Sequence, residues 1–228
     1  MNRPDLSLLD EDQRAAATAP RGPVCILAGA GTGKTRTVTY RIANMVDQGF
    51  VSPQRILAVT FTTRAAGEMR DRLNQMGVGG VQAQTFHAAA RRQLRYFWPQ
   101  VAGDLPWELL DNKFSVVARA VRSLNLDNSK DSIRDYLSEI EWAKSSLIGA
   151  DSYPEVIATT DREAPTDPAK VAEVFRRYEQ LKSTQDRMFL DFDDLLMHIA
   201  GAIENVPSVA EVFREQYRTF AVAEYQDV

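Results

Sequence analysis

The sequence predicts an α/β fold in which a parallel β-sheet is flanked by helices and interrupted by a helical insertion. Three observations support this prediction. An apolar run at residues 24 to 27 passes through glycines into a helical pattern, and the same order of strand, loop and helix returns at residues 55 to 77. Residues 99 to 190 instead carry many charged residues and successive helical stretches without glycine-rich loops. Repeated strand, loop and helix units favour parallel strands, whose ligands bind at the carboxyl ends of the strands.

The composition fits a folded protein with a sizeable core. Of 228 residues, 44% are apolar and 25% are charged, and the formal net charge is −4 from 27 basic and 31 acidic residues. This balance gives no overall basic field, so local patterns have to decide whether nucleic acid is a ligand. The first residues, MNRPDLSLLDEDQ, show no leader pattern, and no apolar run approaches the ~18 residues of a membrane span. We therefore expect a cytoplasmic protein with no membrane partner.

A short helix is predicted before the first strand. LSLLDEDQRAAATAP, residues 6 to 20, offers Asp10 as a helix cap and closes at Pro20. Gln13 lies three residues after Asp10 and fits a reciprocal capping box. Its carboxamide, with a donor and an acceptor in one plane, also suits the edge of an adenine base. The residues leave both interpretations of Gln13 open, and only its place just before the next loop favours the second.

Residues 22 to 35, GPVCILAGAGTGKT, have the spacing of a phosphate-binding loop between a strand and a helix. The strand is predicted at residues 24 to 27, where Cys25, the single cysteine, is expected to be a small buried residue. Ala28 stands where the first glycine of G-x-x-x-x-G-K-[ST] is usually found. Glycines let backbone N–H groups turn onto an anion, and the following helix adds the positive end of its dipole.

The predicted ligand of this loop is ATP with Mg²⁺. Lys34 adds a full positive charge, and the Thr35 hydroxyl suits a magnesium ion that bridges two phosphates. Arg36 opposes the dipole in the first turn, which favours a phosphate or ribose contact over an ordinary surface arginine. The alternative for the whole loop is a glycine-rich turn with a solvated lysine. The candidate ATP-binding residues are Gln13, Ala28, Gly29, Ala30, Gly31, Thr32, Gly33, Lys34, Thr35 and Arg36.

A helix, a strand and a second helix are predicted to follow the loop. TRTVTYRIANMVDQG, residues 35 to 49, repeats apolar residues at helical spacing and ends at Gly49. RILAVTF, residues 55 to 61, has the length and composition of a buried strand, and a helix that ends at Gly77 comes next.

Phe61, Thr62, Thr63 and Arg64 lie at the predicted carboxyl end of this strand. An aromatic ring beside two hydroxyls and an arginine suits a stacked base, with a phosphate at the hydroxyls and the helix N-terminus. In the alternative, Phe61 is a core residue and the threonines cap the helix.

A third strand, residues 81 to 85, meets the helix FHAAARRQLRYFW. Phe86 and His87 open this helix at the same predicted edge, and three arginines and three aromatic residues follow. Interleaved basic and aromatic residues fit a groove for single-stranded DNA, although the aromatic residues could equally pack between domains. With only two histidines, His87 and His198, a histidine metal site is not supported.

These segments together resemble a known family. LDEDQRAAA, AGAGTGKTRT, ILAVTFTTRAAGEMRDRL and VQAQTFHAAARRQLR are similar, in order and spacing, to the Q motif, motifs I and Ia and the TFH motif of superfamily 1A DNA helicases of the UvrD, Rep and PcrA type. The TAPRGPVC lead-in and the DFDDLL segment look most like a second UvrD-type branch of actinobacteria. The resemblance implies a RecA-like P-loop NTPase domain 1A at residues 1 to 90, an inserted all-helical 1B domain at residues 91 to 214, and a return into 1A at residues 215 to 228.

The DFDDLLMHIAGAIE segment, residues 191 to 204, begins with three aspartates. One interpretation is a metal site. The other is that Asp191 caps a helix whose acidic first turn offsets the dipole, and this is favoured because the family has a helix at this place. The rest of the insertion shows no catalytic constellation.

The segment FAVAEYQDV resembles motif II of the family with one departure. The family has an aspartate, which holds Mg²⁺ through water, where this chain has Ala223, and the next residue, Glu224, matches the glutamate that positions the attacking water. The resemblance therefore implies catalytic roles for Lys34 and Glu224. Alanine offers no oxygen, so magnesium organisation and hydrolysis are in doubt although Gln226 and Asp227 are present.

The leading functional hypothesis is implied by the resemblance. The parent protein would be an ATP-dependent 3′-to-5′ DNA helicase that acts on single-stranded DNA and duplex junctions, with repair or replication proteins as possible partners. We expect the present chain, without a second RecA-like domain, to have negligible ATPase activity alone. A second hypothesis is an ATP-gated DNA-binding or interaction module that does not hydrolyse ATP. A third, a P-loop kinase or metabolic NTPase, has no reason to carry the TFT and TFH segments.

Overall fold

The computed structural model describes residues 4–29 and 31–225. The chain forms two compact units, each with its own core. Unit 1 comprises Met1–Arg92 and Ile203–Val228, and unit 2 comprises Gln93–Ala202. No helix of the described residues is both long enough and apolar enough to cross a bilayer.

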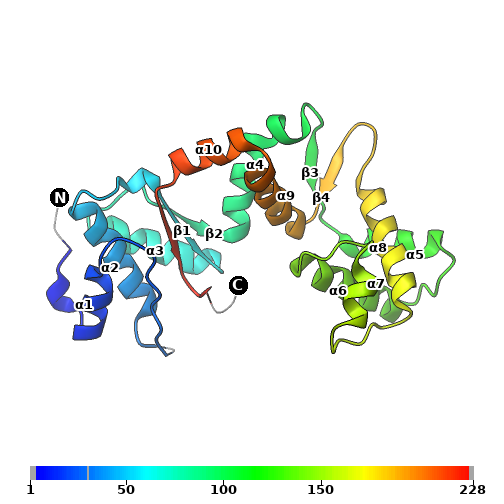
Figure 1. The fold of residues 1–228 in the computed structure, drawn as a ribbon, viewed down its shortest axis with the longest axis horizontal. Helices are drawn as coiled ribbons and strands as arrows, with labels where there is room; N and C mark the ends of the chain where they lie inside the picture. The colour runs from blue at the N-terminus through cyan, green and yellow to red at the C-terminus, as the bar shows by residue number, and fades with distance from the viewer. Residues whose placement is uncertain (1–3, 30, 226–228) are drawn as a thin grey trace. The chain divides into compact units, whose positions relative to one another are not determined.

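Unit 1 is built on a three-stranded parallel sheet (Figure 1). Strand β1 (Ile56–Thr60) lies in the middle, between β2 (Gln82–Thr85) and β5 (Thr219–Val222). In the register of β1 and β2, Thr60 is opposite Thr85, so the two strands end at the same level. The prediction of an α/β chain with a parallel sheet is confirmed.

The middle strand of unit 1 is buried along its whole length. One face of β1 belongs to a cluster with α2 (Lys34–Asp47) and α3 (Thr63–Gln75), and the other face packs against α4 (Phe86–Ala102) and α10 (Pro207–Gln216). A strand covered on both faces needs an unbroken apolar run, which ILAV supplies. The first cluster contains Ile42, Val46, Ile56, Ala58, Met69, Leu73 and Ala223; the second contains Leu57, Val59, Ala89 and Tyr217, with Phe86 and Phe213 packed against it.

The strand expected at residues 24 to 27 is absent from the described part of the sheet, so this prediction was wrong. The segment has no strand pairing, Leu27 is 91% exposed, and Cys25 is exposed rather than buried. An apolar run becomes a sheet strand only where a neighbouring strand satisfies its backbone N–H and C=O groups. Among the described residues, β5 is bonded to β1 alone and offers no such pairing to this segment.

The elements before the sheet are η1 (Leu6–Leu8), α1 (Glu11–Thr18) and η2 (Pro53–Arg55). The helix α1 begins where the sequence predicts, because the Asp10 carboxylate accepts a hydrogen bond from the Gln13 N–H at 2.8 Å. It is fastened to α2 by Arg41, whose guanidinium donates to the carbonyls of Ala16 and Ala19 at 3.1 and 2.9 Å.

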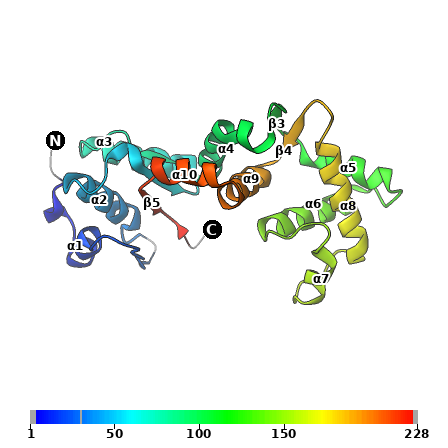
Figure 2. The ribbon, with the colours of Figure 1, turned by 45° about the horizontal axis from the view of Figure 1, so that its top comes forward.

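Unit 2 is a helical cluster with a small sheet. Its core lies among α5 (Lys113–Ser123), α6 (Lys130–Ser145), α7 (Tyr153–Ala158) and α8 (Pro168–Lys182), which Figure 2 shows from a second direction. The helix α9 (Phe192–Asn205) follows the short strand β4 (Met188–Leu190), which pairs in parallel with β3 (Trp107–Leu109). The core includes Val117, Val121, Ile140, Tyr153, Val174 and Tyr178.

Two details of the predicted insertion differ from the structure. The insertion was expected to be all-helical, but it holds the pair β3 and β4, whose three residues each are too short to show a strand period. It was also expected to run to residue 214, whereas unit 2 ends at Ala202. The helix α10 belongs to unit 1 because Phe213 packs against the cluster that holds Leu57 and Val59 of β1.

Candidate functional site

The glycine-rich loop before α2 is open to solvent. Gly29, Gly31 and Thr32 are exposed, and α2 begins directly after the loop at Lys34. Gly31 and Gly33 have φ of 77° and 86°, in the left-handed region that glycine adopts without strain. The first N–H group of α2 that bonds inside the helix is that of Thr37, so those of the preceding turn face the loop end, where an anion binds well. Ala30, one of the predicted ligands, lies outside the described residues.

Lys34 folds back over the loop. Its ammonium group donates to the carbonyl oxygens of Ala28 and Gly29 at 2.9 Å each, and the Thr32 hydroxyl donates to the same Gly29 oxygen at 2.7 Å. Within residues 4–29 and 31–225, no carboxylate lies at ion-pair distance from Lys34. Among the described residues, the Lys34 ammonium group therefore contacts carbonyl oxygens only, and a phosphate would be a stronger partner for its charge.

Gln13 connects α1 to the loop. Its backbone N–H bonds to the Asp10 cap, but its side-chain amide donates to the Thr32 carbonyl at 3.0 Å. A Cβ at Gly33 would lie only 3.0 Å from this amide nitrogen, so the close approach depends on glycine. The Gln13 side chain bonds to Thr32 and not back to the Asp10 backbone, so the structure does not show the reciprocal capping box. The contact of Gln13 with adenine stays a prediction.

Arg36 is directed toward the N-terminal segment. Its guanidinium donates to the Leu8 carbonyl at 2.8 Å and lies 5.7 Å from the centre of the Tyr40 ring. These contacts tie η1 to α2. The phosphate or ribose contact expected for Arg36 stays a prediction, as does the metal-binding role of the half-buried Thr35.

The segment after β1 is exposed at the carboxyl edge of the sheet. Phe61 is 54% exposed, so the alternative that placed it in the core was wrong. Thr62 caps α3, because its hydroxyl accepts from the Ala65 N–H at 3.1 Å, as the cap interpretation predicted. Thr63 opens the helix, and Arg64 pairs with Glu68 at 3.0 Å on the solvent side. This edge therefore presents a ring, an arginine and a capped helix N-terminus.

The segment after β2 lies at the same edge, since Thr60 and Thr85 are paired in register. Thr85 caps α4 by accepting from the Ala88 N–H at 3.2 Å. Phe86 packs partly against the core, and His87 is half-buried. Further along α4 the aromatic residues differ in exposure: Phe97 and Trp98 are buried, whereas Tyr96 is exposed, as are Arg91, Arg92 and Arg95.

Glu224 is held by Thr60, which was not among the site residues predicted from the sequence. The Thr60 hydroxyl donates to the Glu224 carboxylate at 2.9 Å, and the neighbouring Ala223 N–H donates to the Val59 carbonyl at 2.9 Å. Glu224 has φ of 59°, in the left-handed region. A signal for Thr60 was present in principle, as a threonine that ends an otherwise apolar strand. Gln226 and Asp227 lie outside the described residues.

The protein residues at this place do not fit a magnesium ion. Ala223 is 6% exposed and belongs to the core cluster around Ile42 and Ala58, so position 223 supplies no side-chain oxygen. Thr35 is then the remaining predicted ligand, and Mg²⁺ is held in proteins chiefly by carboxylates, phosphates and water.

The aspartates of the DFDD segment cap α9, as predicted. Asp191 accepts from the Asp194 N–H at 3.0 Å, and Asp194 accepts from the Asp191 N–H at 2.9 Å. Oxygen atoms of Asp191, Asp194 and Glu179 lie within 4.8 Å of one another, as in a metal site. Two ammonium groups occupy this neighbourhood instead: Lys144 lies 2.7 Å from Asp191, and Lys182 lies 2.6 Å from Asp194.

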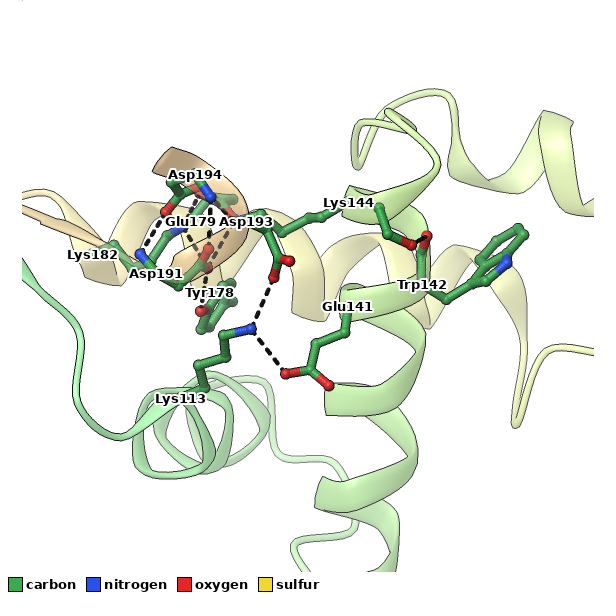
Figure 3. Close-up of polar contacts among 11 residues, drawn as sticks. Lys113, Glu141, Trp142, Lys144, Tyr178, Glu179, Lys182, Asp191, Asp193 and Asp194 are labelled. Atoms are coloured by element: carbon green, nitrogen blue, oxygen red, sulfur yellow. Dashed lines mark hydrogen bonds and ion pairs between the residues drawn. The ribbon is translucent and has the colours of Figure 1, made fainter. Parts of the chain in front are cut away.

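We call these five residues, Lys144, Lys182, Glu179, Asp191 and Asp194, the buried ion network (Figure 3). Burial opposes the charge of Lys144, but the three carboxylates outweigh it and raise its pKa. Burial also raises the pKa of Asp191, yet Lys182 and Lys144 lower it further, so its net pKa lies below the ordinary value. The Tyr178 hydroxyl donates to Asp191 at 2.7 Å. The network joins α6, α8 and the start of α9.

The order of these segments also matches a known family. A model of the UvrD/REP helicase N-terminal domain family matches residues 9–228. The chain belongs to this family. The ATP-dependent DNA helicase UvrD2 of Mycobacterium tuberculosis strain H37Rv is 56% identical over 99% of this chain and 33% of its own length. The ATP-dependent DNA helicases PcrA of Leuconostoc citreum and Staphylococcus aureus strain COL are each 34% identical, over 96% and 97% of this chain.

This UvrD/REP helicase N-terminal domain spans about a third of the length of these relatives, which are matched over 33%, 29% and 30% of their sequences. The predicted resemblance to UvrD-type helicases is confirmed, including the similarity to an actinobacterial UvrD2.

Proposed function

We propose that this chain is the N-terminal part of an ATP-dependent DNA helicase or translocase. The whole protein would couple ATP hydrolysis to 3′-to-5′ movement on single-stranded DNA, at duplex junctions and in repair or replication in the cytoplasm. The relatives named as ATP-dependent DNA helicases support the class of protein. In this proposal unit 1 holds the RecA-like domain 1A, expected at residues 1 to 90 and 215 to 228, and unit 2 lies within the inserted domain 1B, expected at residues 91 to 214.

One observation carries the proposal: unit 1 holds both an exposed glycine-rich loop before α2 and two strands that end at the same level, at Thr60 and Thr85, directly before Phe61 and Phe86. Each feature alone occurs in many proteins. A triphosphate site and a base-stacking edge on one three-stranded sheet are what a motor on nucleic acid requires, because the two ligands must influence one another.

The proposed nucleotide site uses the loop and its two flanking helices. The loop N–H groups and the start of α2 would surround the phosphates, and Lys34 would leave its two carbonyl partners for the phosphate oxygens. Gln13 would contact adenine from α1, and Arg36 the ribose or a phosphate. The open loop and Lys34, which contacts carbonyl oxygens only among the described residues, support this assignment.

The proposed DNA site uses the carboxyl edge. A base would stack on the exposed Phe61 ring, and a phosphate would lie at the N-terminus of α3 near Thr62, Thr63 and Arg64. Phe86 and His87 would contact the next nucleotide, because their strand ends level with β1. Such a site depends on salt, since phosphate contacts release counterions.

Of the proposed steps, hydrolysis has the least support in the chain alone. Glu224 would orient the attacking water, but position 223 supplies no side-chain oxygen and the chain covers about a third of its relatives. We therefore propose that the chain alone binds ATP and DNA with negligible turnover. Ala223 also favours a second candidate function, an ATP-gated DNA-binding or interaction module that never hydrolyses ATP.

The proposal is tested first by the binding of ATP and DNA and then by phosphate release. We expect the chain to bind a fluorescent ATP analogue and a short oligothymidine, each with micromolar or tighter affinity, and to release little phosphate. Absence of both affinities would reject the proposal.

The variant Ala223→Asp, placed in the protein that contains this chain, separates the two candidates. A gain of DNA-stimulated phosphate release favours the helicase, and no gain favours the module. Arg64→Ala in the same background is the matched control, because it weakens DNA binding without changing position 223.

A further inference from the structure

We propose that Thr60 is a positioning residue that holds the Glu224 carboxylate and couples the DNA edge to the nucleotide site. This inference rests on the proposed function, because it assumes that Phe61 meets a base and that Glu224 faces the phosphates. It assigns a role to a side chain for which the sequence pattern gives none.

Thr60 joins the segment that precedes Phe61 to the segment that carries Glu224. It is the last residue of β1, it is 1% exposed, and it directly precedes the exposed Phe61. Its hydroxyl donates to the Glu224 carboxylate at 2.9 Å, across 164 positions of sequence. One side chain therefore links the strand that ends in the base-stacking ring to the candidate catalytic carboxylate.

The contact is doubled by the backbone. Two consecutive residues of β1 contact two consecutive residues after β5. The Ala223 N–H donates to the Val59 carbonyl at 2.9 Å, and the Thr60 hydroxyl donates to the Glu224 carboxylate at 2.9 Å. The two strand ends therefore move together. A displacement of the turn after β1 would therefore also displace the segment that carries Glu224.

Glu224 needs such a partner. Its φ of 59° is a conformation that a residue with a side chain adopts only where its surroundings hold it. A hydroxyl that donates to a carboxylate in a partly buried place is a strong, directional contact. Removing the hydroxyl frees the carboxylate to rotate.

The functional consequence is a reciprocal coupling. A base on Phe61 and a phosphate at the N-terminus of α3 pull on the turn between Thr60 and Thr63, and this changes the orientation of the Glu224 carboxylate toward a bound triphosphate. By linkage, a triphosphate that repels or attracts this carboxylate changes DNA affinity by the same factor. Effects of about 5- to 150-fold are usual for coupled sites.

The test is a binding cycle on the chain itself, which does not require hydrolysis. Dissociation constants for a short oligothymidine are measured with and without saturating adenosine 5′-(β,γ-imido)triphosphate, for the parent and for three variants. Thr60→Val removes the hydroxyl and keeps the shape, and Thr60→Ser keeps the hydroxyl. Thr39→Val is the matched control, because Thr39 is also a buried threonine of unit 1, but its hydroxyl bonds to the Arg36 carbonyl at 2.7 Å.

We expect a coupling factor of about fivefold or more in the parent, Thr60→Ser and Thr39→Val, and a factor near one in Thr60→Val. Each ligand alone should bind Thr60→Val as it binds the parent. A merely structural hydroxyl would lower stability in Thr60→Val and leave the coupling in place.

The outcomes separate this inference from the proposed function. If both ligands bind and Thr60→Val keeps the parental coupling, or the parent shows none, the inference is overturned and the function stands. If neither ligand binds the parent, the function is overturned and the inference with it. Should Thr60→Val fail to fold, Glu224→Ala removes the other end of the same bond, and parental coupling in that variant overturns the inference.

Discussion

The lysine of the loop and the lysines of the buried ion network meet opposite environments. Lys34 touches two carbonyl oxygens and no carboxylate among the described residues, beside an exposed loop. Lys144 and Lys182 are 2% and 3% exposed, and each ammonium group lies within 3.2 Å of all three network carboxylates. Lys34 therefore has no carboxylate partner among the described residues, whereas Lys144 and Lys182 are paired with the network carboxylates.

This difference separates binding from stability. A buried ammonium group with fixed carboxylates is expensive to disturb, because removing one member leaves uncompensated charge in a poorly hydrated place. An ammonium group that bonds only to carbonyl oxygens loses little free energy when it exchanges them for a phosphate. Substitutions in the buried ion network should therefore lower stability, whereas substitution of Lys34 should lower ligand affinity.

The largest effect is expected from Lys144→Met. It leaves Asp191 and Asp194 short of one positive charge, and we expect the free energy of unfolding of unit 2 to fall by about 3 to 5 kcal/mol. Urea unfolding followed by tryptophan fluorescence measures this selectively, because the three tryptophans, Trp98, Trp107 and Trp142, all belong to unit 2.

Lys170→Met is the control for Lys144→Met, since Lys170 is exposed on α8 and should change the unfolding midpoint little. Nucleotide affinity should be the same in both variants wherever unit 1 remains folded. Equal stabilities of the two variants would show that the buried ion network contributes no more than a surface lysine.

The next effect is expected from Lys34→Met. Loss of a charge-assisted contact should weaken binding of a fluorescent ATP analogue by about 10- to 100-fold, because hydrogen bonds to charged groups contribute about 1.5 to 3 kcal/mol. Thermal unfolding should barely change, since the ammonium group contacts only loop carbonyls. A stability loss as large as that of Lys144→Met, or an unchanged affinity, would contradict the comparison.

A smaller or similar effect is expected from Phe61→Ala. Loss of a stacked base should weaken oligothymidine binding by about 1 to 3 kcal/mol, measured by fluorescence anisotropy at constant salt. Phe50→Ala is the matched control, because Phe50 is 47% exposed in the same unit and lies away from the strand ends, under the Arg21 guanidinium. Equal affinities of the two variants would remove Phe61 from the site.

The smallest effect is expected from mild acid. Burial lowers the pKa of His198, against the attraction of Asp194, and the pKa of Asp191 is also lowered. Both groups then bind fewer protons folded than unfolded, so the stability of unit 2 should fall as pH drops below 6.5, and fall again below 3.8.

Tryptophan-monitored unfolding above and below pH 6.5 measures the first step. His198→Gln should flatten it and keep the second step, because the variant retains Asp191, whose lowered pKa causes that step. A midpoint that does not respond to pH across 6.5 would assign His198 no part in stability.

Local patterns explain which parts of the fold were predictable. The apolar run of β1 reports burial on both faces, and the caps at Asp10, Thr62 and Asp191 depend on residues within three positions of them. Phe61 and Phe86 follow the ends of two consecutive parallel strands, so their common edge was predictable too. The glycine-rich loop before α2 was recognisable from its spacing, and its phosphate-binding role stays a prediction.

Long-range pairing explains what was missed. The run at residues 24 to 27 has strand composition, but a strand also needs a partner, which composition does not report. The bond from Thr60 to Glu224 joins residues 164 positions apart. Lys144 and Lys182 look like surface residues in an amphipathic helix, and only the packing of α6 and α8 beside Asp191 brings their charges together.

The bond from Gln13 to the Thr32 carbonyl has a geometric consequence for the loop. A trans peptide group is planar, and its oxygen and its hydrogen point in opposite directions. With the Thr32 oxygen held toward α1, the hydrogen on the Gly33 nitrogen has to point away from α1. A side chain from the first helix thereby fixes the rotation of a peptide plane inside the glycine turn and selects the side on which that donor is presented.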